Sequence, residues 1–235
     1  MLAEHQFKKY LLYAFGEIVL VVIGILIALQ VNEMSNNKAQ LKKEIIYLKE
    51  IEKSLSYDLE NEINGAIKYT NKQTEVYEIY KAAISKYPND VPIDTIYQLI
   101  RKWSSPPWQL EINLVAFDNL NSMGMDLISN HELRNEISQI YGNLIPRAMH
   151  HNKTHENWNF QHLYPTLNST FIYYENTLTH DQILFLKNDI PTLNELNIHN
   201  KHFVTGYIWR LNDLKPKVET LLVHLRDEIY RLQNI

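Results

Sequence analysis

Cysteine is absent from this chain of 235 residues, and glycine and proline are scarce, with 6 and 8 residues. The absence of cysteine excludes disulfides, thiolate metal sites and a cysteine nucleophile. The scarcity of glycine and proline argues against a loop-rich all-β fold. The net charge is −4, and no basic patch is interleaved with aromatic residues, so nothing favours nucleic-acid binding.

The chain also lacks the short motifs that accompany catalysis. It has no glycine-rich phosphate loop, no nucleophile elbow, no kinase signature and no calcium loop. Neighbouring carboxylates such as Asp58 and Glu60 fall on a solvated helical surface in this pattern. We therefore expect a protein that is not an enzyme, and the sequence assigns it no cofactor.

One long hydrophobic run is present, at residues 10–31, where only Glu17 and Gln30 are strongly polar. As an α-helix it would span roughly 33 Å, which is about the thickness of the hydrocarbon core of a bilayer. We predict a transmembrane helix. A cleaved signal peptide is an alternative, although Ala28-Leu29-Gln30 is a poor cleavage site. A buried core helix is a second alternative.

The charges that flank this segment bear on its orientation. Lys8 and Lys9 precede it, whereas Glu33 follows it, and this favours a cytoplasmic N-terminus. Lysines further along, between residues 38 and 49, count against that orientation. We predict a short cytoplasmic tail at residues 1–9, a transmembrane helix at 10–31 and a helical extracytoplasmic domain at 32–235. The predicted location is the inner membrane of a bacterium, with the domain in the periplasm.

Small residues gather on one face of the predicted membrane helix. That face recurs at steps of three and four residues, and Gly24 and Ala28 form a small-x-x-x-small pair that lets two helices approach closely in lipid. We expect it to pack against a second copy of the chain or against another membrane protein. The alternative is that glycine and alanine are simply common in membrane helices. The residues of the face are Ala14, Glu17, Val21, Gly24 and Ala28.

Glu17 is the one charged residue in the span, and a carboxylate inside a bilayer is usually paired or placed against a partner. It could reach the interface and meet Lys8 or Lys9. It could form a hydrogen bond across a helix oligomer. It could also carry protons as part of a larger membrane complex.

Residues 8–33 read KKYLLYAFGEIVLVVIGILIALQVNE. This stretch resembles the anchor signature GExxLVVxGILIALQxN of a family of single-span bacterial membrane proteins that is common in Bacteroidota. Residues 116–141 resemble its mid-domain segment of two helices joined at a Ser-x-Gly turn. Met34, Ser35 and Asn36 replace the Trp-Asn-Glu that follows the signature in the family. The resemblance implies an anchored helical protein and supplies no activity, cofactor or catalytic residue.

Beyond the anchor, the hydrophobic pattern is helical. Apolar residues recur at three- and four-residue steps from Leu41 to Ile67, and a helix is expected to run to about residue 85 with a hinge at Asn36-Asn37. Proline is expected to kink a later helix at Pro146, to end it at Pro165 and to begin the last helix at Pro216. The predicted fold class is all-α, with the transmembrane helix continuing into a long helix and then an antiparallel multi-helix bundle.

The best candidate metal ligands are His151, His155 and His162, which lie four and seven residues apart. Two histidines at i and i+4 can bind one ion. The signal is weak, because Asn152 stands where a zinc protease would carry its glutamate, and an ordinary polar bundle face explains it as well. A second pair, His199 and His202, is weaker still. We therefore assign no metal.

Taken together, these features predict a membrane-anchored helical interaction or scaffold protein that associates through its transmembrane helix. Two alternatives remain. One is a periplasmic sensor or ligand-binding bundle. The other is a proton-coupled subunit of a larger membrane complex that uses Glu17.

Overall fold

The computed structural model describes residues 2–170 and 177–234, with side chains described from residue 15 onward except that of Thr170. All regular structure in these two ranges is helical, which confirms the all-α class. The helices are α1 (Leu2–Asp58), α2 (Asn64–Lys86), α3 (Ile93–Trp103), α4 (Val115–Met123), α5 (His131–Gln139), α6 (Ile145–Trp158), α7 (Tyr164–Thr170), α8 (His180–Asn188), α9 (Ile190–Ile198) and α10 (Thr205–Gln233).

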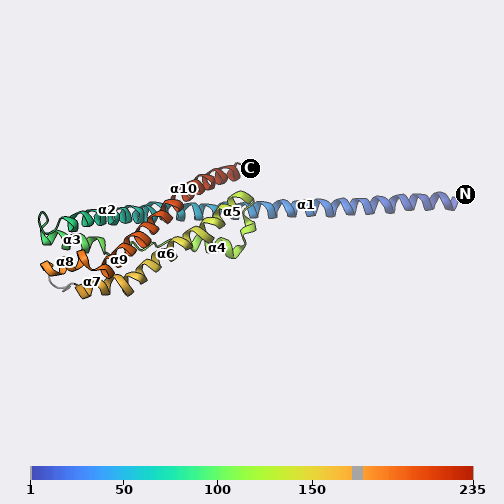
Figure 1. The fold of residues 1–235 in the computed structure, drawn as a ribbon. Helices are drawn as coiled ribbons and strands as arrows, with labels where there is room; N and C mark the ends of the chain where they lie inside the picture. The colour runs from blue at the N-terminus through green and yellow to red at the C-terminus, as the bar shows by residue number, and fades with distance from the viewer. Residues whose placement is uncertain (1, 171–176, 235) are drawn as a thin grey trace.

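Most of these helices join end to end into three long arms. Single π-helical turns make the joins: η1 (Leu59–Ile63), η3 (Ile140–Leu144), η4 (Asn159–Leu163) and η5 (His199–Val204). The first arm is α1–η1–α2, the second α5–η3–α6–η4–α7 and the third α9–η5–α10. The third arm runs antiparallel to the other two (Figure 1).

The domain has two distinct ends (Figure 1). At the near end, α1 enters the domain beside α4, α5 and the C-terminus of α10. At the far end lie α3, α7, α8 and the tip of α2. The remaining α1 residues project from the near end as an isolated helix.

The expected hinge at Asn36-Asn37 is wrong, because α1 is helical throughout residues 2–58. No glycine or proline occurs between residues 25 and 64, so nothing in this stretch interrupts the backbone hydrogen bonds. After the π turn η1, α2 continues the first arm to Lys86, close to the predicted end at residue 85. The projecting part of the first arm and the beginning of its packed part therefore belong to a single helix, α1, and the turn η1 joins α1 to α2.

Prolines are tolerated within the arms. The expected end of a helix at Pro165 is wrong, because the second arm continues through Pro165 as it does through Pro146. Each of these prolines is the second residue after a π-helical turn, η3 or η4. Proline lacks an N–H and crowds the carbonyl four residues earlier, and a π turn shifts the hydrogen bonds to a five-residue spacing that relieves this conflict. Pro216 lies inside α10 rather than at a helix start.

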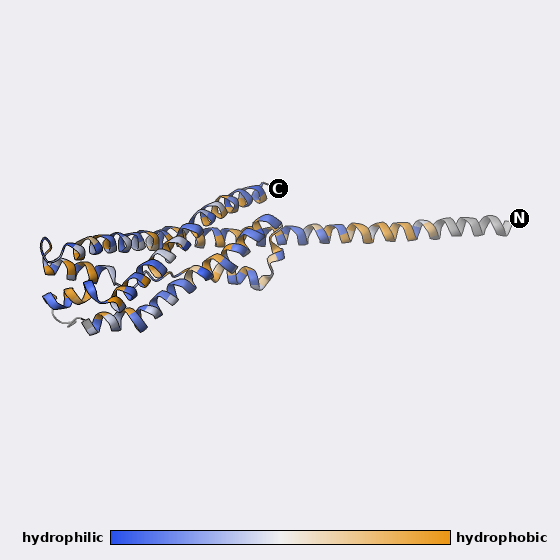
Figure 2. Cartoon of the chain, viewed as in Figure 1, coloured by the Kyte–Doolittle hydropathy of each residue, from blue (hydrophilic) through white to orange (hydrophobic). Residues whose placement is uncertain are grey.

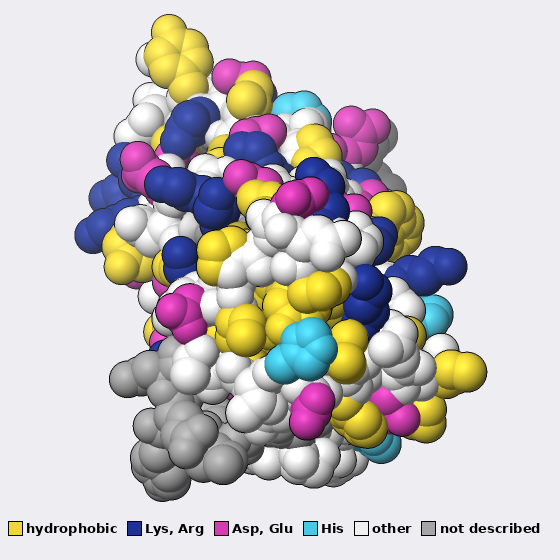
Figure 3. Space-filling model, turned by 60° about the vertical axis from the view of Figure 1, so that its left-hand side comes forward, with side chains coloured by type: hydrophobic (Ala, Val, Ile, Leu, Met, Phe, Trp, Pro, Cys, Tyr) yellow, Lys and Arg dark blue, Asp and Glu magenta, His cyan; other side chains and the backbone are white. Residues whose placement is uncertain are grey.

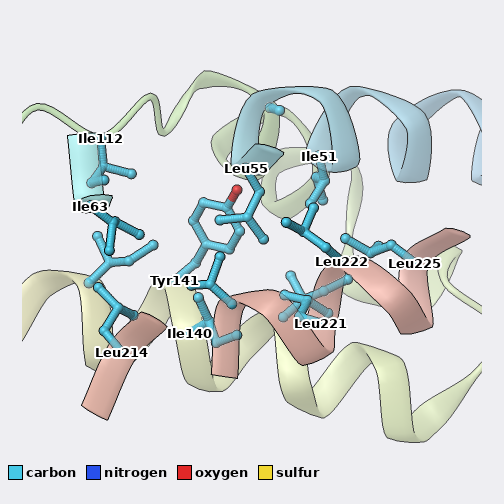
Figure 4. Packing of buried hydrophobic residues seen from close by; sticks show 14 of the residues in the cluster. Ile51, Leu55, Ile63, Ile112, Ile140, Tyr141, Leu214, Leu221, Leu222 and Leu225 are labelled. Carbon is cyan, nitrogen blue, oxygen red and sulfur yellow. The ribbon is translucent and has the colours of Figure 1, made fainter. Parts of the chain in front are cut away.

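The near core fills the space between α1, α10 and the start of the second arm. It is mainly aliphatic, and Leu55, Ile63 and Leu211 in it are fully buried. Figure 4 shows side chains from the first and third arms interleaving around Tyr141. Burying each such side chain is worth about 1.5–3 kcal/mol, so this core holds the three arms together.

The far core is built on aromatic side chains from α2 and α3. Tyr80 and Trp103 stack with their ring centroids 6.1 Å apart, and Tyr77 lies 4.8 Å from Trp103. Side chains from α8 and α9, including Ile183 and Leu196, complete this core. The domain therefore has two cores of different chemistry, one at each end.

An extended segment, residues 104–114, crosses between the ends, and α4 begins directly after it at Val115. Buried side chains form hydrogen bonds with its backbone groups. Asn152 donates to the carbonyl of Trp108 at 2.6 Å, and Asp58 accepts from the N–H of Asn113 at 3.1 Å. The expectation that Asp58 lies on a solvated surface is therefore wrong, because this hydrogen bond holds its carboxyl group in the interior, where the residue is 1% exposed. Gly65 has no side chain to collide with Trp108, whose ring would lie 2.9 Å from an added Cβ. The segment thus needs no strand partner.

Candidate functional site

The exposed part of α1 is the first candidate site. Its side chains from Phe15 to Val31 are exposed, including Ile18 at 62% and Leu20 at 75%, although they are overwhelmingly apolar. An 18-residue window there has a mean hydropathy of 2.2, and none of it is buried. Figure 2 shows this hydrophobic band standing clear of the domain. The helix is long and apolar enough to span a membrane.

The predicted packing face lies within this band. Glu17, Val21, Gly24 and Ala28 are exposed, and nothing lies within 4 Å of an added Cβ at Gly24. The side chains of Ala14, Lys8 and Lys9 lie outside the described residues, so this structure does not test a Glu17–lysine pair. Among the described side chains the face contacts no other part of the domain, which leaves it open to a partner.

A polar helical spacer separates the apolar band from the domain. Residues 32–40 are all exposed, and the first buried side chain of the chain's described part is Glu44. Nine helical residues rise about 14 Å. The carboxylate of Glu44 accepts hydrogen bonds from the backbone N–H and the hydroxyl of Ser129, at 2.7 and 2.8 Å. These hydrogen bonds therefore fix α1 at the point where it enters the domain.

The contact between Glu44 and Ser129 also shows that one prediction from the sequence is wrong. The spacing of Ser129 and Glu132 predicts a capping box at the start of α5, but Ser129 forms its hydrogen bonds with Glu44. Asn130 caps α5 instead, accepting from the N–H groups of Glu132 and Leu133.

The second candidate site is a buried histidine pair between the second and third arms. His155 on α6 and His199 at the start of η5 face each other, with their Nε2 atoms 2.9 Å apart. Their side chains are 1% and 0% exposed. Two neutral imidazoles at this distance share one hydrogen bond, so one Nε2–H donates and the other Nε2 accepts. Each ring then has its Nδ1 left over, and neither Nδ1 has a partner among the described residues.

Other polar atoms without partners surround this pair. Asn159, one turn beyond His155, is 0% exposed, and neither its oxygen nor its nitrogen has a partner among the described residues. The Nε1 of Trp103 is likewise unpartnered, and its ring meets His199 edge-on at 4.8 Å. Buried polar groups are nearly always paired, so such a cluster marks a place of special chemistry or of bound solvent.

Burial sets the charge of the pair. Desolvation, with a smaller contribution from His151, lowers the pKa of His155 to about 3. Desolvation, followed by the effect of His155, holds the pKa of His199 well below its ordinary value. Both rings are therefore neutral at physiological pH.

The three weak candidate metal ligands, His151, His155 and His162, do not converge. His151 is half-buried with its Nε2 3.1 Å from the carbonyl oxygen of Phe203, and His162 lies 3.9 Å from a carboxylate oxygen of Glu195. His162 lies within the turn η4, whose wider hydrogen-bond spacing rotates it off the face that carries His151 and His155. No group of three or more His, Asp or Glu side chains in the described ranges is placed to hold a metal ion.

A pocket of about 750 Å³ opens at the far end, between α3 and the segment around η4 and α7. Its wall is mostly aromatic and aliphatic, with Tyr97, Ile100 and Phe160, and Arg101 supplies one cation. Figure 3 shows hydrophobic side chains gathered on this end of the domain, with basic side chains and a histidine beside them. The volume lies in the range of small-molecule sites.

No family model, curated protein or solved structure matches this chain in the comparisons. The site is therefore defined by its geometry alone.

Sequence reasoning missed the pairing of His155 with His199. The sequence pattern placed each histidine with neighbours on its own helix, because helical periodicity indicates only which residues share a face of one helix. The two residues are 44 positions apart and meet only through the packing of two arms. The one available signal was that His155 and Asn159 continue the buried stripe of Ala148 and Asn152 at successive steps of four, three and four residues.

Proposed function

We propose that this chain is a single-span membrane protein that holds a helical interaction domain at a fixed distance from the bilayer. One observation carries the proposal: an exposed apolar helix continues without a break into the packed core of the domain. A soluble protein would expose this surface to water at a large cost. Because the spacer is helical rather than flexible, the anchor and the domain turn together.

The proposed arrangement places the N-terminus in the cytoplasm and the domain in the periplasm of a bacterium. The support is the Lys8-Lys9 flank and the likeness of residues 8–33 to the anchor signature of the Bacteroidota family, to which we propose that the chain belongs.

Extraction from membranes tests the anchor, and labelling of an introduced cysteine tests the orientation. Membrane pellets should retain the protein at alkaline pH. A Lys72→Cys variant, altered at an exposed side chain, should react with an impermeant maleimide in spheroplasts without lysis. Release by alkali would refute the anchor, and labelling only after lysis would refute the orientation.

We further propose that the anchor associates through the face of Ala14, Glu17, Val21, Gly24 and Ala28. Support comes from the small residues, which allow close approach of helices, and from the absence of any described intramolecular contact to this face. A second copy of the chain is the simplest partner, because a two-fold axis would bring each Gly24 against its equivalent.

The absence of native cysteine makes this face easy to test. Single substitutions Val21→Cys and Ala28→Cys should give disulfide-linked dimers in membranes under mild oxidation. The matched controls Val19→Cys and Leu26→Cys, on the opposite side of the helix, should not. Adding Glu17→Gln and Gly24→Leu to the Ala28→Cys chain should abolish the cross-link. Equal cross-linking at all four positions would refute a specific face.

The far-end pocket favours a second candidate function, a ligand-binding bundle. The pocket joins an aromatic wall to the Arg101 guanidinium, which suits an aromatic or aliphatic molecule with a negative group. Native mass spectrometry of the purified full chain in detergent should then show a retained small molecule. An Arg101→Gln variant should lose it, whereas Lys72→Gln, at an exposed lysine that is not part of the pocket wall, should keep it. Identical spectra from all three proteins without added mass would refute this function.

A further inference from the structure

Arginine pairing in this domain is uneven. Three of the six arginines form ion pairs with carboxylates, whereas Arg101, Arg147 and Arg210 have no carboxylate within ion-pair distance in the described part of the chain. Asp and Glu outnumber Lys and Arg by 27 to 23, so unpaired arginines are not a consequence of scarce acids. Arg147 and Arg210 line one and the same pocket.

This basic pocket has a volume of about 450 Å³ and lies between the second and third arms. Arg147, His150, His151 and Thr154 come from α6, and Arg210 faces them from α10. No aspartate or glutamate is among the lining residues. A second small pocket near the start of α5 provides a contrast: its wall holds several carboxylates, and its arginine is already engaged by Glu228.

Two side chains of the basic pocket, those of Arg210 and His151, are held in place by backbone atoms. Arg210 donates from Nη1 to the carbonyl of Gly206 at 2.8 Å, and the Nε2 of His151 lies 3.1 Å from the carbonyl oxygen of Phe203. Gly206 permits both contacts, because an added Cβ would lie 3.3 Å from the His151 ring and 3.5 Å from the Arg210 guanidinium. These side chains are therefore positioned before any ligand arrives, which lowers the entropy lost on binding.

The electrostatics of the pocket agree with its composition. The pKa of His151 is lowered, first by desolvation and then also by the neighbouring charges of Arg210 and His150. Positive charge is thus concentrated here without internal compensation. A guanidinium presents a planar fork of donors that matches carboxylate and phosphate oxygens, and two such groups around one cavity can hold a single anion from two sides.

We propose that the basic pocket binds the oxyanion group of a small molecule, a phosphate or a carboxylate, between Arg147 and Arg210. Thr154 and His150 lie on its wall as further hydrogen-bonding groups. The site belongs to the domain surface rather than to the anchor, so its ligand comes from the aqueous side. It is independent of how the anchor associates.

The test uses the full chain in non-ionic detergent, titrated with sodium phosphate or sodium succinate at constant ionic strength. One of the two anions should raise the melting temperature in a saturable way and shift the imidazole resonances of His150 and His151. The Arg147→Gln variant, altered at an exposed side chain, should bind roughly tenfold more weakly, and Arg147→Gln with Arg210→Gln should not bind. Which anion saturates identifies the oxyanion.

The matched control is Arg226→Gln, which removes the same charge from an exposed arginine outside the pocket. It should bind the anion as the unmodified chain does. The proposal is overturned if neither anion gives a saturable response, or if Arg226→Gln weakens binding as much as Arg147→Gln does. Because Arg210 also contacts Gly206, circular dichroism of each variant shows whether a loss of binding reflects a loss of fold.

Discussion

The near core and the far core both fill the space between helices, but they do so with different kinds of side chain. The near core is largely Leu, Ile, Val and Ala, and its unpartnered buried polar atoms are two tyrosine hydroxyls, of Tyr141 and Tyr207. Around the far core, unpartnered atoms belong to several residue types, including the buried Trp103 and Asn159. Buried polar atoms are nearly always paired, so the far side is the part of the domain where bound water or a ligand has the most groups to pair with.

This contrast also separates the part of the domain that holds the projecting helix from the candidate sites. The near core contains the packed part of α1, so it fixes the projecting apolar part of α1 relative to the bundle. The histidine pair and the 750 Å³ pocket involve α3, α6, α7 and the third arm instead. A substitution at the far end can therefore change a candidate site without loosening the packing of α1.

The largest expected effect is on stability at the near core. Leu55 is 0% exposed, and Leu55→Ala should lower the free energy of unfolding by about 2–5 kcal/mol through lost burial and a residual cavity. Tyr57→Ala, two residues away at an exposed position, should change it by less than about 0.5 kcal/mol. Urea unfolding of the full chain in detergent, followed by circular dichroism, measures both. Similar values for the two variants would show that the near core does not carry stability.

Acid should act on the far side first. The folded pKa values of His155 and His199 lie below the ordinary 6.5, so below that pH the unfolded chain binds protons that the folded chain does not. The free energy of unfolding should therefore fall as the pH drops from about 6.5 toward 3, by about 1.4 kcal/mol per pH unit for each histidine. Denaturant unfolding at several pH values measures this slope.

The contribution of Asp58, at the near core, to the free energy of unfolding should change with pH in the opposite direction. Burial, opposed in part by the hydrogen bond from Asn113, raises its pKa from 3.8 to about 6. Its contribution favours the folded chain at low pH and is lost as the pH rises from 3.8 through 6. An Asp58→Asn variant should therefore steepen the acid loss between those values, whereas His155→Leu should flatten it. A His155→Leu protein with the slope of the unmodified chain would mean that the histidine pair is not what titrates.

Removing an unpartnered amide should have a smaller effect of the opposite sign. Asn159→Leu replaces a fully buried side chain whose polar atoms lack described partners, so it should leave stability unchanged or raise it by about 1–3 kcal/mol. Asn152→Leu is the matched control on the same helix face. It should destabilise, because Asn152 donates to the carbonyl of Trp108. If Asn159→Leu is the more damaging of the two, the amide has a bound partner such as ordered water.

Local pattern predicted the helical elements well and their junctions poorly. The periodicity from Leu41 onward indicated the first arm, and the structure confirms it as α1–η1–α2. Proline positions misled, because π-helical turns before Pro146 and Pro165 depend on packing that no local rule encodes. Ser129 likewise matched a cap motif but was captured by Glu44, which is 85 residues distant. Of the candidate sites, the apolar span was predictable, whereas the histidine pair and the basic pocket arise only where arms meet.

The smallest expected effect concerns the surface of the near end. Arg226 donates to Glu52 at 2.7 Å across α10 and α1, but its side chain is 56% exposed, so water and salt screen the pair. Arg226→Gln and Glu52→Gln should each lower the free energy of unfolding by less than about 1 kcal/mol, and the double variant by no more than their sum. Urea unfolding at low and high salt measures this, with the difference disappearing at high salt. A loss of several kcal/mol that persists in high salt would instead place part of the near end's stability in its surface charges, and the division between a stabilising near core and a functional far side would have to be redrawn.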